Sequence, residues 1–236
     1  MQKRKRLAWI GAEIGLMAYH SVSAAIFGVL KWPIAIISIV SVPALALVLL
    51  DTLYEHFSNL QWFLLGFGSY YLLWSVFLKR LRNQWFSTFE HEVTHCIFAK
   101  AMGNRVTGMR VTAVEGGHMQ YIGTSSWLIE VAPYFFPTIT MVALAILPWV
   151  PEVTPAEALF IVGVTVAYHL TSTWVETHIG QSDLQKAGFI FSILFLPGAN
   201  IACFNIVLNV ALFGWSGISD WYHAVLSSSL ILFAII

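Results

Sequence analysis

Charged residues are scarce in this chain. Only 10% of its 236 residues are Asp, Glu, Lys or Arg, and 58% are hydrophobic, whereas soluble domains carry about 25% charged residues. The mean hydropathy is +0.75, so we expect an integral, multi-pass membrane protein embedded in a lipid bilayer. The net charge is zero and the few charges lie at the ends of apolar segments, which argues against nucleic acid as a partner.

Cysteine is also rare. The chain contains two, Cys96 and Cys203, and their spacing forms no recognisable pattern. This excludes a disulfide framework and a cysteine-based zinc site. Cys96 lies five residues after His91, a spacing that points away from the same helix face, so we interpret it as a packing residue.

Long polar stretches are missing, and apolar segments dominate the chain. Segments long enough to cross a bilayer occupy residues 7–30, 33–50, 60–78, 128–150, 157–177 and 187–213. The fold class predicted from them is an all-α polytopic membrane protein with about six to eight membrane helices and one small β-hairpin.

The basic clusters predict the orientation of the chain. Residues 3–6 are basic and precede an apolar run without a convincing cleavage site, so we expect an uncleaved anchor with a cytoplasmic N-terminus. The cluster at residues 79–82 should also be cytoplasmic, which requires an even number of crossings before it. Three apolar runs precede it, so either residues 31–33 kink a re-entrant pair or one run does not cross.

The strongest functional signal is the sequence His-Glu-Val-Thr-His at residues 91–95, in a helix expected over residues 84–102. Residues four apart share a helix face, so His91 and His95 can present two imidazoles to one zinc ion. Glu92 then stands where a metalloprotease has its general base. The alternative is a pair of helix-face histidines that only pack or form hydrogen bonds.

The segment after this helix is polar and prone to form strands. Residues 104–122 contain short β-prone stretches around a turn at Glu115-Gly116-Gly117. A hairpin cannot expose its backbone edges to lipid, so we expect it to pack on protein next to the zinc helix. There it could bind an extended substrate by strand addition.

A catalytic zinc usually has three protein ligands, and the third must come from further along the chain. Ionisable residues between residues 169 and 183 join two long apolar helices and are therefore functional candidates. Asp183 is our predicted ligand, although its position also suits a helix N-cap. Glu176 is the alternative ligand, in a gluzincin-type membrane protease.

Several motifs in this order resemble the site-2 protease family of intramembrane zinc metalloproteases. They are the HExxH helix, the hairpin, the sequence Ala-Pro-Tyr-Phe-Phe-Pro at residues 132–137 and the later Asp183, within residues 85–200. The resemblance implies zinc bound by His91, His95 and Asp183, with Glu92 as catalytic residue. It implies hydrolysis of peptide bonds in membrane-embedded or membrane-associated substrates.

The chain departs from this family in two respects. Leu184 follows Asp183 where the family has glycine, and no PDZ-like domain interrupts the chain, so the protein looks like a compact form. We divide it into N-terminal membrane helices of unknown role (1–83), a metalloprotease core (84–213) and a C-terminal apolar tail (214–236).

Two further questions stay open at this point. A non-catalytic zinc-binding membrane protein is the non-enzyme alternative, but a purely structural zinc site needs no base and Glu92 counts against it. Asn200 and Asn205 lie in an apolar helix. They could hold substrate backbone or an oxyanion, or form hydrogen bonds between packed helices.

Overall fold

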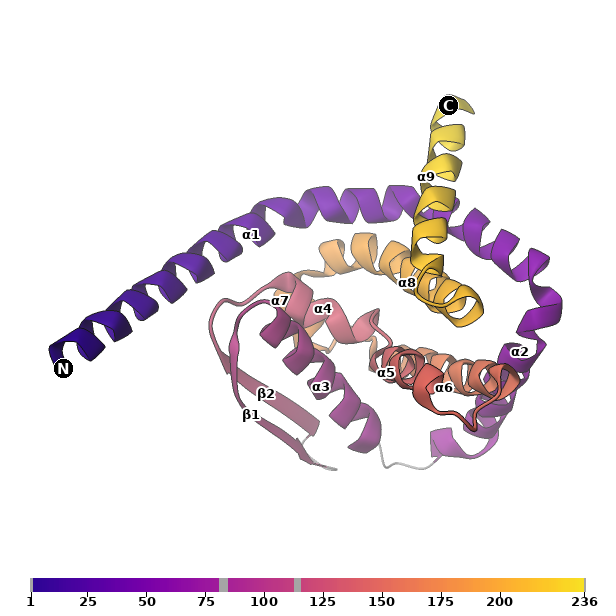
Figure 1. Ribbon diagram of the computed structural model, residues 1–236, viewed down its shortest axis with the longest axis horizontal. Helices are drawn as coiled ribbons and strands as arrows, with labels where there is room; N and C mark the ends of the chain where they lie inside the picture. Colours follow the sequence, from indigo (N-terminus) through magenta and orange to yellow (C-terminus); the bar gives the residue numbers. More distant parts are fainter. Residues whose placement is uncertain (1, 81–84, 113–115, 236) are drawn as a thin grey trace.

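The computed structural model describes residues 2–80, 85–112 and 116–235 (Figure 1). Helices make up most of it, together with one two-stranded antiparallel sheet. The α-helices are α1 (Gln2–Glu55), α2 (Phe57–Val76), α3 (Trp85–Ala101), α4 (Trp127–Val131), α5 (Thr138–Ile146), α6 (Pro155–Glu176), α7 (Ser182–Ala187), α8 (Phe189–Phe213) and α9 (Gly217–Ile235). The strands are β1 (Arg105–Thr112) and β2 (Gly116–Ile122). A mostly helical fold with one small hairpin is therefore confirmed.

The described part of the chain has fewer candidate membrane spans than we predicted. Three helical segments are long and apolar enough to cross a bilayer: Val22–Glu55, Pro155–Glu176 and Phe189–Phe213. A fourth results if the pair Trp127–Tyr134 and Thr138–Trp149, bent by 75°, counts as one span. The predicted number of six to eight is not confirmed.

One reason for the smaller number is that two predicted segments form a single helix. Residues 7–30 and 33–50 both belong to α1, which continues through Pro33 and Pro43. Figure 1 shows α1 as one long, curved helix beside α8. Packing around a membrane helix can compensate for the backbone hydrogen bond that proline removes. No re-entrant pair forms at residues 31–33.

Close backbone contacts hold α1 against α8. Ser38 Oγ donates a hydrogen bond of 2.6 Å to the Phe195 carbonyl, and Asn205 Nδ2 donates one of 3.1 Å to the Leu45 carbonyl. A Cβ atom on Gly198 would lie 2.2 Å from the Ser38 carbonyl oxygen, so only glycine permits this approach. Residue numbers increase in the same direction along both helices at these contacts, so α1 and α8 run parallel.

Glycine likewise permits the contact between α2 and α6. A Cβ atom on Gly66 would lie 2.1 Å from the Phe160 carbonyl oxygen, and one on Gly163 would lie 2.1 Å from that of Phe63. Small residues at such positions let membrane helices pack with their backbones in contact. This packing fixes the position of α6, whose last residue is part of the site described below.

The hairpin packs on α3, as predicted. Arg105 pairs with Ile122 at one end and Thr112 with Gly116 at the other, with an irregularity between Val106 and Gly108. Both strands contact α3, whose observed bounds lie within one residue of the predicted ones. Of the residues that we assigned to the turn, Gly116 and Gly117 instead begin β2, and Glu115 lies outside the described residues.

Candidate metal centre

One face of α3 is polar although it is buried. The exposed fractions are 8% for His91, 7% for Glu92, 1% for Thr94 and 5% for His95. Buried polar side chains normally have hydrogen-bond partners, and Thr94 has two: it donates to the Glu90 carbonyl at 2.9 Å and contacts a threonine hydroxyl of α5. The partners of the two histidines define the site.

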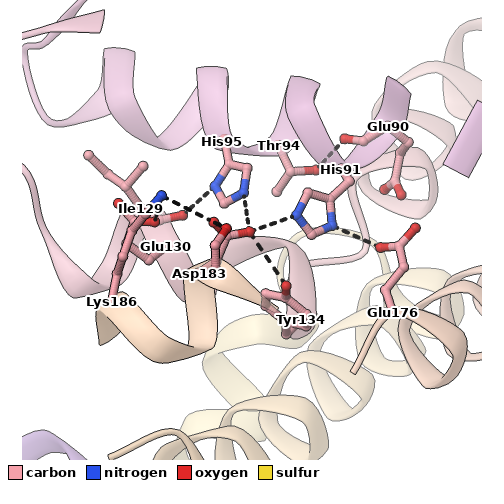
Figure 2. Close-up of polar contacts among 11 residues, drawn as sticks. Glu90, His91, Thr94, His95, Ile129, Glu130, Tyr134, Glu176, Asp183 and Lys186 are labelled. Carbon is pink, nitrogen blue, oxygen red and sulfur yellow. Dashed lines mark hydrogen bonds and ion pairs between the residues drawn. The ribbon is translucent and has the colours of Figure 1, made fainter. Parts of the chain in front are cut away.

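Asp183 brings α7 to both histidines of α3 (Figure 2). Its Oδ2 atom lies 3.2 Å from His91 Nε2 and 3.3 Å from His95 Nε2. One ligand atom from each of the three residues lies within 4.8 Å of the others. Tetrahedral ligands at zinc distances are about 3.3 Å apart, so the spacing around Asp183 suits zinc.

The hydrogen bonds of the two imidazoles determine where their protons lie. His95 Nδ1 lies 2.7 Å from the Ile129 carbonyl oxygen, and His91 Nδ1 lies 2.8 Å from Glu176 Oε2. A carbonyl and a carboxylate only accept hydrogen bonds, so each Nδ1 carries the hydrogen. In the neutral rings both Nε2 atoms then direct lone pairs toward Asp183 Oδ2, and a cation bound between these three atoms would complete the arrangement. The donor set therefore fits zinc.

The remaining oxygen of Asp183 has its own partners. Ser182 Oγ lies 3.2 Å from Oδ1 and Lys186 Nζ lies 3.5 Å from it. Lys186 Nζ is also 3.5 Å from Glu130 Oε2. Oδ1 is thus occupied by these contacts, whereas Oδ2 faces the two histidines and accepts a long hydrogen bond of 3.5 Å from the Tyr134 hydroxyl.

The N-cap interpretation of Asp183 is wrong in this structure. The residue in the N-cap position of α7 is Gln181, and Asp183 lies inside the helix. Its carboxylate faces the two histidines of α3 instead of the amides of its own first turn (Figure 2). Glu176 does not join the converging ligand atoms, because it contacts the far nitrogen of His91.

Glu92 borders a cavity of about 400 Å³ beside the histidines. The cavity is lined by parts of α3, β2 and α7, including the His91, His95 and Asp183 side chains. Burial raises the pKa of the Glu92 carboxyl above its ordinary value. A raised pKa favours a carboxylate that accepts a proton near neutral pH.

Strand β2 lies directly against Glu92. A Cβ atom added to Gly117 would be 2.5 Å from Glu92 Cγ and 2.8 Å from Thr88 Cγ2. The hairpin therefore forms one wall of the cavity, and glycine at this position allows the strand to approach the carboxylate.

The asparagines of α8 form contacts between helices. Asn200 Nδ2 donates to the Tyr134 carbonyl at 3.0 Å, and Asn205 is completely buried against α1. Neither lines the cavity at the histidines, so their packing interpretation holds. Cys96 belongs to no group of converging metal-binding side chains among the described residues.

Sequence reasoning missed three residues that support the site: Ile129, Tyr134 and Lys186. Lys186 had a detectable signal, because ionisable residues beside apolar segments are functional candidates. Ile129 contributes its backbone carbonyl, which every residue type has, so the sequence gives no signal for this contact.

A His/His/Asp group with a neighbouring carboxylate, set among long apolar helices, is the arrangement expected of a membrane metallopeptidase. The family model described as Peptidase M50B-like matches residues 39–198. The chain therefore belongs to this family, and the resemblance to site-2 proteases is confirmed. No curated protein and no solved structure gives a match.

Proposed function

We propose that this protein is a zinc metalloendopeptidase that hydrolyses peptide bonds of membrane-embedded or membrane-associated substrates. His91, His95 and Asp183 hold the zinc ion, and Glu92 is the catalytic base. The observation that carries the proposal is the convergence of the three ligand atoms, within 4.8 Å of one another, in the cavity that Glu92 lines.

Zinc bound there would supply Lewis acidity at the scissile carbonyl and make water a stronger nucleophile. Glu92 accepts the proton of the attacking water and later delivers it to the nitrogen of the leaving amine. The carbon–nitrogen bond breaks as that nitrogen is protonated. Asp183 and the two histidines keep their orientation throughout, because each is held by a second protein group.

Strand β2 offers a binding edge for the substrate backbone. Pairing with β1 uses one edge of β2, and residues 116–119 of this strand line the cavity. An extended peptide that pairs with the other edge would pass Gly117 and present its carbonyls near Glu92. An intact substrate helix hides its carbonyls in its own hydrogen bonds, so the substrate must unwind first.

The helix ends favour a site near the membrane surface. Glu176 is the last residue of α6, and Asp183 precedes α8 by a few residues. Both helices are long enough to cross the hydrocarbon core, which is about 30 Å thick. We therefore infer that the metal site lies near one face of the bilayer, where the two spans are joined.

The distribution of charge favours the cytoplasmic side for this end. Lys31 lies against the Phe191 ring at the start of α8, 5.1 Å from its centroid, and Lys186 lies on α7. Glu152 and Glu157 lie at the opposite end of α6. The positive-inside rule then places the metal site toward the cytoplasm.

The same orientation accounts for the predicted basic cluster at residues 79–82. Because α1 is one helix, α1 and α2 are the two helical segments that precede residues 79 and 80. Although α2 is not among the candidate spans, it is 20 residues long, and if it crosses the bilayer with α1 the number of crossings before the cluster is even. The multi-pass protein then has its N-terminus and the basic cluster on the cytoplasmic side.

The decisive experiment compares the wild type with Glu92→Gln in liposomes that contain zinc. The probe is a library of single-span peptides labelled at both ends. We expect cleavage by the wild type, a decrease of several orders of magnitude in the variant, and equal zinc content in both. Equal zinc content without any cleavage by the wild type would favour the non-catalytic zinc-binding alternative.

A further inference from the structure

Glu176 has a role at the metal centre that the ligand set does not include. Its Oε2 atom lies 2.8 Å from His91 Nδ1, and its side chain is 18% exposed. Asp183 approaches the same imidazole from the other nitrogen, at 3.2 Å. Figure 2 shows His91 between the two carboxylates.

We propose that Glu176 is a positioning residue that holds the Nδ1–H group of His91 and so selects Nε2 as the metal-binding atom. A carboxylate only accepts hydrogen bonds, so this contact requires the hydrogen on Nδ1 and leaves the lone pair on Nε2. A negative charge at Nδ1 also makes the imidazole a better metal ligand. The inference rests on the ligand set of the proposed function.

The two histidines have unequal partners. His95 Nδ1 donates to the Ile129 carbonyl, a neutral backbone group, whereas His91 Nδ1 donates to a carboxylate. Charge-assisted hydrogen bonds are roughly twice as strong as neutral ones. The orientation of His91 therefore depends on a side chain that a substitution can remove. The orientation of His95 depends on a backbone carbonyl that no substitution removes.

Glu176 also connects the metal centre to a membrane span. It ends α6, and the Thr177 amide closes that helix on the Thr173 carbonyl at 2.8 Å. The glycine contact between α2 and α6, at Gly163 and Phe63, sets the position of this helix. The partner of His91 is thus carried by a rigid element, which is what an orienting group requires.

The test measures zinc affinity of purified, folded protein in detergent, by competition with a chromophoric chelator. The variants are Glu176→Gln, which keeps the shape, and Glu176→Asp, which keeps the charge. Glu152→Gln is the matched control, because Glu152 is exposed at the other end of the molecule. Cobalt(II) spectra of each variant report the coordination number.

We expect Glu176→Gln to bind one zinc ion 10- to 100-fold more weakly than the wild type, with a four-coordinate cobalt spectrum. Glu176→Asp should recover part of this loss, and Glu152→Gln should match the wild type. Wild-type affinity in Glu176→Gln would overturn the positioning role. Complete loss of zinc, as expected for His91→Ala, would also overturn it, because Glu176 would then be a ligand.

A second measurement needs no variant of Glu176. Nitrogen NMR of the zinc-loaded wild type, labelled in its histidines, should show His91 with hydrogen on Nδ1. Hydrogen on Nε2 would overturn the proposal even if the variants did not fold. A wild-type protein that binds no zinc would overturn the ligand set itself, whereas normal zinc binding with an unaffected Glu176→Gln overturns the positioning role alone.

Discussion

Replacing Gly117 with alanine places a methyl group where β2 touches the predicted catalytic base. The added carbon would lie 2.5 Å from Glu92 Cγ, 2.6 Å from Glu92 Oε1 and 2.8 Å from Thr88 Cγ2. Carbon atoms in contact are about 3.5–4.0 Å apart. Either the strand must therefore move away from α3 by about 1 Å, or the Glu92 side chain must turn out of place.

Both responses should reduce activity far more than metal binding. A displacement of about 1 Å in a catalytic arrangement can cost about 100-fold in rate, and overpacking costs about 1–3 kcal/mol of stability. The three atoms nearest to this methyl group belong to Glu92 and Thr88, and none belongs to a zinc ligand. We expect Gly117→Ala to keep its zinc, lose about two orders of magnitude in peptide hydrolysis and unfold at a somewhat lower temperature.

The assay is peptide hydrolysis in liposomes, together with zinc content and the unfolding midpoint. The matched control is Gly108→Ala on β1, where the added carbon meets only Gln120 Oε1, at an ordinary 3.9 Å. This control should behave like the wild type. Wild-type hydrolysis by Gly117→Ala would refute the argument that close approach of the hairpin to Glu92 matters for catalysis.

Two predictions concern the zinc ligands directly. His91→Ala and His95→Ala should each abolish stoichiometric zinc binding, because a site with two of three ligands is too weak; metal analysis after dialysis against a chelator checks this, and zinc retained in both variants would contradict it. Asp183→Asn keeps the size of the side chain but removes the charge that zinc prefers. It should lose zinc and activity with little change in the unfolding midpoint of the metal-free protein, and a variant with wild-type zinc affinity would rule out Asp183 as third ligand.

Local sequence patterns predicted the parts of the site that depend on local structure. The spacing of His91 and His95 placed both on one helix face, and the observed α3 begins and ends within one residue of the predicted helix. The short β-prone stretches after α3 predicted the hairpin, although Gly116 and Gly117, which were assigned to its turn, belong to strand β2. Each of these depends on interactions between residues close in sequence, which composition and spacing record directly.

The prediction of a break at residues 31–33 was wrong, because these residues lie inside the continuous helix α1. Lys31, Trp32 and Pro33 are consistent with a break between two spans, because proline removes a backbone donor. In the structure, α1 continues there beside α8. The Trp32 ring lies 6.4 Å from that of Phe191 and the Lys31 ammonium lies 5.1 Å from its centroid. These contacts bridge more than 150 residues of sequence, so hydropathy along the chain does not reveal them.

The family match also extends further toward the N-terminus than the motifs indicated. Our resemblance began at residue 85, whereas the family model matches from residue 39 and so includes the last third of α1 and all of α2. These helices carry no catalytic motif. Within the matched range Gly66 packs its backbone against α6, and such a packing contact has no short sequence signature.

The groups that hold the ligands in place were the least predictable part of the site. Glu176 and His91 are 85 residues apart in sequence, and both Asp183 and Glu176 were candidates for the same coordination position. Spacing alone could not separate them, because residues 177–188 join α6 to α8 and bring both carboxylates to the same end of the molecule. In the structure the two carboxylates contact different nitrogens of the His91 ring. Asp183 faces Nε2 and Glu176 faces Nδ1. A ligand and its orienting partner can therefore both be carboxylates only seven residues apart in sequence, and the imidazole nitrogen that each one faces indicates its role.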